Sequence, residues 1–297
     1  MNTKNLYDRF DLQRGDHKCN GENEIKRSLD RSLKFFIALV FLLATSVNAI
    51  AGGLVDTSLD RFLAADFTTN PSEEITNPWW TLTAGKNFLY FAEDGGDCVW
   101  NLTEVLEDTA NGFLGDYSGI TARVVLDRGW VDEDCVHGED FQAFMATDPE
   151  PEESTYDWYA QDWEKNIWYM GENTFDGDFG GSFVAGCDGA EPGIVILGSP
   201  GRGDFYSQEF YADEAEDWGK VLNFKNIDGL VCMTTKEWTP LERGAIEHKW
   251  YCSDGITGKL SRIEELHGKT VLVQLVAEDI DPPPAVGLPI NPDPSCP

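Results

Sequence analysis

Two glutamates that face each other across a predicted hairpin are the residues best placed to do chemistry in this chain. Period-two alternation predicts strands on both sides of a turn at residues 240–244. With that turn centred on Glu242, Glu237 lies opposite Glu247. Opposed carboxylates repel each other unless a cation or a shared proton relieves them. The pair is therefore a candidate calcium site or a candidate acid–base pair.

The same register offers a plainer interpretation of these glutamates. Lys249 lies diagonally across from Glu237 and could neutralise it in an ordinary salt bridge. His248 lies in the same strand and is a candidate ligand of a copper site assembled by tertiary contact. A register slip of one residue would remove every one of these pairings. The sequence leaves the metal, acid–base and salt-bridge interpretations open.

The predicted hairpin also places Cys232 opposite Cys252, which makes a cross-strand disulfide the first pairing to expect. Six of the seven cysteines follow residue 49, and none of them has Cys-x-x-Cys spacing. An even count without metal-type spacing is typical of a protein folded in an oxidising compartment. We expect three disulfides.

An apolar stretch at residues 35–47 divides a basic leader from the rest of the chain. Lys34 precedes the stretch, its length is short for a bilayer span, and small residues near Ala49 offer a cleavage site. Residues 1–49 are therefore predicted to be a leader and signal peptide. The mature protein is expected to be secreted, periplasmic or exposed on the cell surface, with no stable membrane span.

Net charge limits the choice of partners. The formal charge is −31 at pH 7. Such a field repels phosphate backbones and anionic lipid headgroups, which excludes nucleic acid as a partner. A cation, a small ligand or a basic protein suits the charge better.

The elements that must position the glutamates are mostly short strands. Residues 50–76 are predicted to form an extended N-terminal segment, residues 77–280 the main β domain, and residues 281–297 a Pro-rich tail that ends near Cys296. Helical periodicity is weak and is limited to residues 101–110 and 214–221. The predicted fold is all-β, a curved antiparallel sheet built of hairpins and stapled by disulfides, with minor helical turns. Both a sandwich and a partly open barrel fit it. Strands are expected at residues 88–92, 120–127, 156–161, 167–170, 205–211, 230–238, 245–252, 260–265 and 270–276.

Several motifs in order resemble one family. They include Asn-Pro-Trp-Trp at residues 77–80, Thr-Tyr-Asp-Trp-Tyr-Ala-Gln-Asp at 155–162 and Lys-Glu-Trp-Thr-Pro-Leu-Glu at 236–242. Together they resemble a family of uncharacterised secreted bacterial proteins that carry an aromatic, Gly-punctuated β domain. The resemblance covers roughly residues 77–276. It implies the fold and the export, and it transfers no activity or site residue.

These observations favour a binding or envelope protein over an enzyme. The ligand is unknown, and a divalent cation such as calcium at Glu237 and Glu247 is the candidate. One alternative is a carboxylate-dependent hydrolase such as a glycosidase, which would use the same two glutamates. Another is a copper-binding surface protein that uses His248.

Overall fold

The structure, a computed structural model, describes residues 52–67, 71–174, 182–284 and 290–292. Contacts divide the chain into units of residues 1–36 and 37–297, and every described residue lies in the second unit. The predicted leader at residues 1–49 lies outside the described residues. Within the part of the chain that is described, no helix is long and apolar enough to cross a membrane.

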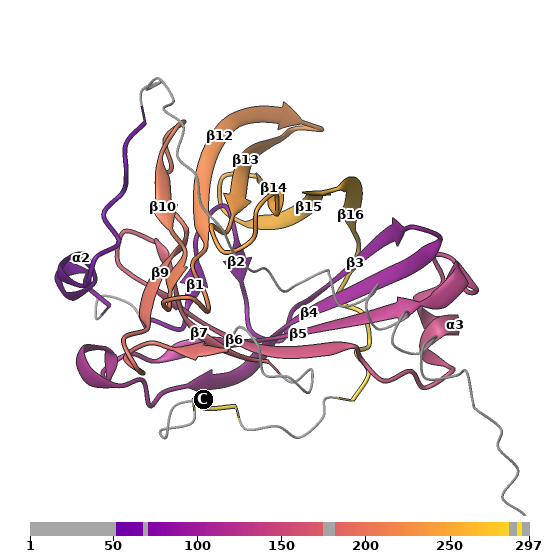
Figure 1. Cartoon of the computed structure of the whole chain (residues 1–297), viewed down its shortest axis with the longest axis horizontal. Helices are drawn as coiled ribbons and strands as arrows, with labels where there is room; N and C mark the ends of the chain where they lie inside the picture. The colour runs from indigo at the N-terminus through magenta and orange to yellow at the C-terminus, as the bar shows by residue number, and fades with distance from the viewer. Residues whose placement is uncertain (1–51, 68–70, 175–181, 285–289, 293–297) are drawn as a thin grey trace, which may run out of the picture. The chain divides into compact units, whose positions relative to one another are not determined.

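One antiparallel sheet contains nearly all of the strands (Figure 1). Its strand order is β10-β12-β13-β14-β15-β16-β3-β4-β5-β6-β7-β9-β11, with β8 beside β7. A separate pair consists of β1 (Ile75–Thr76) and β2 (Thr81–Leu82). The strands of the main sheet are β3 (Asn87–Asp94), β4 (Asp97–Ala110), β5 (Ala122–Asp132), β6 (Glu153–Gln161), β7 (Ile167–Thr174), β8 (Phe183–Val184), β9 (Glu191–Ile196), β10 (Phe205–Ser207), β11 (Glu209–Phe210), β12 (Trp218–Ile227), β13 (Leu230–Trp238), β14 (Ile246–Ser253), β15 (Gly258–His267) and β16 (Lys269–Glu278).

The two edges of this sheet meet through one continuous piece of chain. β10 pairs with β12 at one edge and β11 pairs with β9 at the other, and only Gln208 separates β10 from β11. The Tyr206 hydroxyl donates to the Val195 carbonyl across the seam, at 3.4 Å. Gly193 also has no room for a side chain, because a Cβ there would lie 2.4 Å from the backbone of Gln208. The sheet is thus a nearly closed barrel, which confirms the all-β prediction in its barrel form.

Side chains alternate between an inner and an outer face of the curved sheet. The inner face is identified by contacts across the barrel: the Tyr90 hydroxyl on β3 donates to the Leu260 carbonyl on β15, two strands away. The outer face of β4 to β7 is apolar and covered. Phe62 of α2 (Leu59–Ala64) packs edge-on against Trp168, and Phe141 of α3 (Phe141–Met145) packs against Trp100.

Neither segment with weak helical periodicity forms a helix. Residues 101–110 belong to β4, and residues 218–221 of the second segment begin β12. The helical interpretation was wrong because β4 is paired on both sides, with β3 and with β5. Local propensity yields to that pairing and to burial on both faces.

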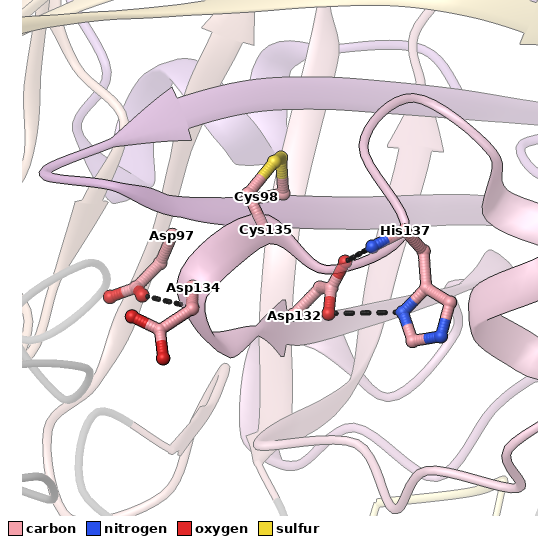
Figure 2. Close-up of a disulfide and its surroundings, with 6 residues drawn as sticks. All are labelled: Asp97, Cys98, Asp132, Asp134, Cys135 and His137. Atoms are coloured by element: carbon pink, nitrogen blue, oxygen red, sulfur yellow. Dashed lines mark hydrogen bonds and ion pairs between the residues drawn. A yellow bond between two sulfur atoms is a disulfide. The ribbon is translucent and has the colours of Figure 1, made fainter.

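A disulfide joins Cys98 to Cys135 and fixes the turn that follows β5 (Figure 2). Asp132 accepts a hydrogen bond from the His137 backbone N–H at 2.8 Å and contacts its ring Nδ1 at 3.1 Å. Asp97 accepts from the Asp134 N–H at 2.8 Å. Asp134 and Cys135 have φ angles of 56° and 49°, in the left-handed region. The His–Asp contact and the disulfide therefore hold a turn in a conformation that the chain would otherwise avoid.

The first and last described segments lie against the barrel. Residues 50–76, predicted to be extended, contain α2 and β1. The C-terminal residues 279–284 and 290–292 follow the outer face. There the Asn87 side chain donates to the Ile280 carbonyl, and the Trp158 indole N–H donates to the Ile290 carbonyl, both at 2.9 Å.

Candidate functional site

A row of three glutamates crosses the inner face of neighbouring strands. Glu237 on β13 pairs with Glu247 on β14, and Glu247 pairs with Glu265 on β15. The predicted register is confirmed, as is the disulfide that it implied between Cys232 and Cys252. Glu265 escaped the sequence analysis because the second hairpin of this row was not aligned to the first.

Lys249 lies between the first two glutamates of the row. Its ammonium is 2.9 Å from Glu237 and 3.1 Å from Glu247. The salt-bridge interpretation of the sequence is therefore the one that the structure contains. Burial by itself lowers the pKa of Lys249, but the two carboxylates outweigh burial and raise that pKa well above its ordinary value. Lys249 therefore stays charged, although only 23% of its side chain is exposed.

The third glutamate, Glu265, is held in its neutral form. Burial, with the Glu247 carboxylate as second cause, raises the pKa of Glu265 to about 8, although Lys249 opposes the shift. Glu265 therefore holds a proton at neutral pH in the free protein.

A second carboxylate group lies on β6 and β7. The Tyr169 hydroxyl is 2.5 Å from Asp157 and 2.7 Å from Glu172. One hydroxyl carries one hydrogen, so it can donate to only one of the two carboxylates, and the other carboxyl must itself be protonated to hydrogen-bond. In agreement, burial raises the pKa of Glu172 to about 8 and that of Asp157 well above its ordinary value.

Three more carboxylates complete the arrangement. Burial and the nearby Asp217 raise the pKa of Glu209 well above its ordinary value, and burial raises the pKa of Asp217 to about 6. Burial also raises the pKa of Asp127, which accepts hydrogen bonds from Asn101 and Thr103. The charge of Lys249 lowers the pKa of Asp127, Glu209, Asp217 and Glu265 and so opposes the effect of burial on each of them. We call the following set the acidic inner face: Asp127, Asp157, Glu172, Glu209, Asp217, Glu237, Glu247 and Glu265.

Aromatic rings line the inner face toward the opposite end of the barrel. Trp80 packs against Tyr159 and Tyr251, with ring centroids 5.1 and 6.3 Å apart. Asn77 fixes the Trp80 segment, because its side chain accepts from the Trp79 and Trp80 N–H groups and donates to the Leu197 carbonyl. The Asn-Pro-Trp-Trp motif thus anchors one end of the barrel interior.

The structure separates His248 from the two glutamates. His248 alternates with them on β14 and lies on the outer face, where its ring is 3.8 Å from Glu264. Among the described residues, no group of three or more His, Cys, Asp or Glu side chains could hold a metal ion. The copper and calcium interpretations stay predictions.

Sequence reasoning missed most of the acidic inner face. Asp157, Tyr159 and Gln161 share one side of their strand, which was visible in the sequence as alternation. That pattern normally marks a solvent-facing side. Only closure of the barrel turns this polar side inward.

Comparisons with known proteins add little. No family model matches the chain, and no curated protein matches it. Among solved structures, the chain is similar to a "putative exported protein with YmcC-like fold" from Bacteroides fragilis. The identity is 10%, the alignment covers 66% of this chain and 96% of the other, and the TM-score is 0.32. A likeness this distant carries no argument about function, so the resemblance to the secreted family remains a prediction.

Proposed function

We propose that this is a secreted binding protein that holds a small cationic ligand on its acidic inner face. The observation that carries the proposal is the excess of carboxylates around one ammonium, Lys249. Burial raises the pKa of Glu172 and of Glu265 to about 8 and that of Glu209 well above its ordinary value, so their ionised forms need a positive charge nearby. A bound cation would supply that charge and would release those protons.

An organic ammonium suits the site better than a bare metal ion. The rings of Trp80, Tyr159 and Tyr251 share the barrel interior with the carboxylates, and aromatic faces attract ammonium groups. Calcium at Glu237 and Glu247 would have to displace the Lys249 ammonium, which already contacts both. The same contacts give no support to a glycosidase acid at this pair.

The test is calorimetric titration of the mature protein with 1,4-diaminobutane, and separately with Ca²⁺. We expect the diamine to bind, and to bind more tightly as the pH rises from 6 to 8, with proton release visible as a dependence on buffer ionisation enthalpy. The substitutions E265Q and E209Q should each weaken binding roughly ten-fold, or about 1.4 kcal/mol.

The matched control is E107Q, since Glu107 is exposed and lies outside the acidic inner face. It should bind like the wild type. Failure of the wild type to bind the diamine at any pH would overturn the organic-cation proposal. Tight Ca²⁺ binding that is abolished by E247Q would show instead that Glu247 belongs to a calcium site.

A further inference from the structure

Two hairpin tips at one end of the barrel expose large apolar side chains. The turn between β12 and β13 and the turn between β14 and β15 lie at the same end, because β13 and β14 are paired neighbours. Four side chains at these tips have exposed fractions of 36 to 78%: Phe224, Ile227, Val231 and Ile256. Apolar groups that gather in this way mark a contact surface more often than scattered ones do.

The two tips form one unit. Val231 pairs with Ser253, and the Cys232–Cys252 disulfide joins the strands one residue further in. The Phe224 ring lies 5.4 Å from Trp79, and Gly258 packs so closely on the Trp79 backbone that a Cβ there would clash with it. The register puts Phe224 and Val231 on one side of the ribbon and Ile227 on the side of Lys225, so the apolar side chains flank both sides of one rigid base.

Basic side chains lie on the outer face of β12 to β15, in rows that cross the strands. Lys225, Cys232, Cys252 and Lys259 face one another across four strands. Further from the tips, Lys220, Lys236 and His248 form a second row. Between and beyond these rows, the Arg262 guanidinium lies 4.7 Å from the Trp250 ring and the Lys236 ammonium 5.0 Å from the Trp238 ring.

We propose that these hairpin tips and the outer face of β12 to β15 dock on a membrane surface with anionic headgroups. Moving away from the tips, the surface presents apolar side chains, then lysines, then tryptophans beside cations. A lipid interface changes in the same order, from acyl chains to headgroups to water. Lysine stems can lie along the acyl boundary while their ammonium groups reach the phosphates. Contact of this kind is peripheral and needs no spanning segment.

The overall charge of −31 does not forbid this contact. Exposed charges further away than about 8 Å are largely screened at physiological ionic strength, so a membrane experiences the local face. Two acids at this face are already paired, Glu264 with Arg262 and Glu278 with Lys259, which leaves Lys220, Lys225 and Lys236 as its further lysines. At the tips, the Asp254 carboxylate accepts from the N–H groups of Ile256 and Thr257 and holds the turn. Asp228 is the acid that opposes docking.

The experiment is co-sedimentation of the mature protein with vesicles. We expect it to bind vesicles of phosphatidylglycerol and phosphatidylcholine in equal parts, to bind pure phosphatidylcholine far more weakly, and to leave the anionic vesicles in high salt. I256S and K225E should each lower the partition coefficient, the double variant by roughly ten-fold or more. D228N should raise it.

Val136 provides the matched control, because it is 73% exposed and lies in the turn after β5. V136S should leave vesicle binding unchanged. Thermal melting verifies that each variant is folded. The proposal fails if wild-type protein does not sediment with anionic vesicles, or if I256S and V136S bind equally well. These outcomes are independent of the diamine titration, because I256S leaves the inner face intact.

Discussion

At the scale of single residues, Lys249 decides whether the glutamate row can be tolerated. Its ammonium contacts Glu237 and Glu247, and Glu237 is also held by the Thr235 hydroxyl at 2.8 Å. Replacing Lys249 with methionine would leave two neighbouring carboxylates without their cation. We expect K249M to lower the free energy of unfolding by about 3–5 kcal/mol, as measured by denaturant titration.

Lys86 supplies the comparison for that experiment. Its ion pair with Asp279 is about half exposed on both sides, so K86M should cost less than about 1 kcal/mol. Adding E237Q to K249M should recover part of the lost stability, since it removes one uncompensated charge. Equal costs for K249M and K86M would contradict the role assigned to Lys249.

Glu265 gives the protein a pH dependence with a definite sign. Its pKa in the folded state, about 8, lies above its ordinary value of 4.5. The folded protein therefore binds a proton that the unfolded chain releases, and stability falls as the pH rises from about 4.5 to about 8. Between pH 5 and 8.5, the free energy of unfolding of E265Q should fall by roughly 1–2 kcal/mol less than that of the wild type, as measured by denaturant titration at each pH. E107Q should follow the wild-type curve, and an E265Q curve parallel to it would contradict the assignment.

At the scale of elements, the C-terminal tail acts as a strap on the outer face of the barrel. Arg128, 3% exposed, donates to the carbonyls of Pro283 and Pro284 at 2.8 and 3.1 Å and pairs with Glu104. Ending the chain after Ile280, in a C187S background so that the loss of Cys296 breaks no disulfide, removes these acceptors and exposes the Arg128–Glu104 pair. We expect the truncated protein to lose about 2–4 kcal/mol of stability.

A smaller substitution isolates one contact of the strap. W158F keeps a ring under the tail but removes the hydrogen bond to the Ile290 carbonyl, and it should cost about 1 kcal/mol. Melting of the two variants side by side measures both effects. A truncated protein as stable as the wild type would show that the strap is not part of the folded core.

At the scale of the whole molecule, cysteine pairing links the fold to processing of the leader. Cys187 is disulfide-bonded, and Cys98 pairs with Cys135 and Cys232 with Cys252. Cys19 and Cys296 lie outside the described residues, and the three disulfides expected in the mature chain would use Cys296 as the partner of Cys187. If residues 1–49 are removed on export, peptide mapping under non-reducing conditions should link Cys187 to Cys296. A link to Cys19 would contradict cleavage of the leader.

Local pattern determined much of this protein. Alternation and turn residues predicted the hairpin around Glu242, and with it the pairing of Cys232 with Cys252 and of Glu237 with Glu247, because the period of two and the turn centre together fix the register. The same reasoning gave the all-β class. It failed at residues 101–110, where pairing on both sides overrides a helix-like spacing of apolar residues.

Only the tertiary structure decided which way the strands face. Alternation separates Glu237, Glu247 and Glu265 from Lys236, His248 and Glu264, but it cannot say which set is enclosed. Closure of the barrel through Gln208 turns these glutamates inward, where burial raises the pKa of Glu265, and leaves Lys236 and His248 on the outer face. Composition gave the chain one large negative charge. The fold distributes the charged side chains between the inner and the outer face of the sheet. Which face a side chain occupies depends on contacts between strands that are far apart in the sequence.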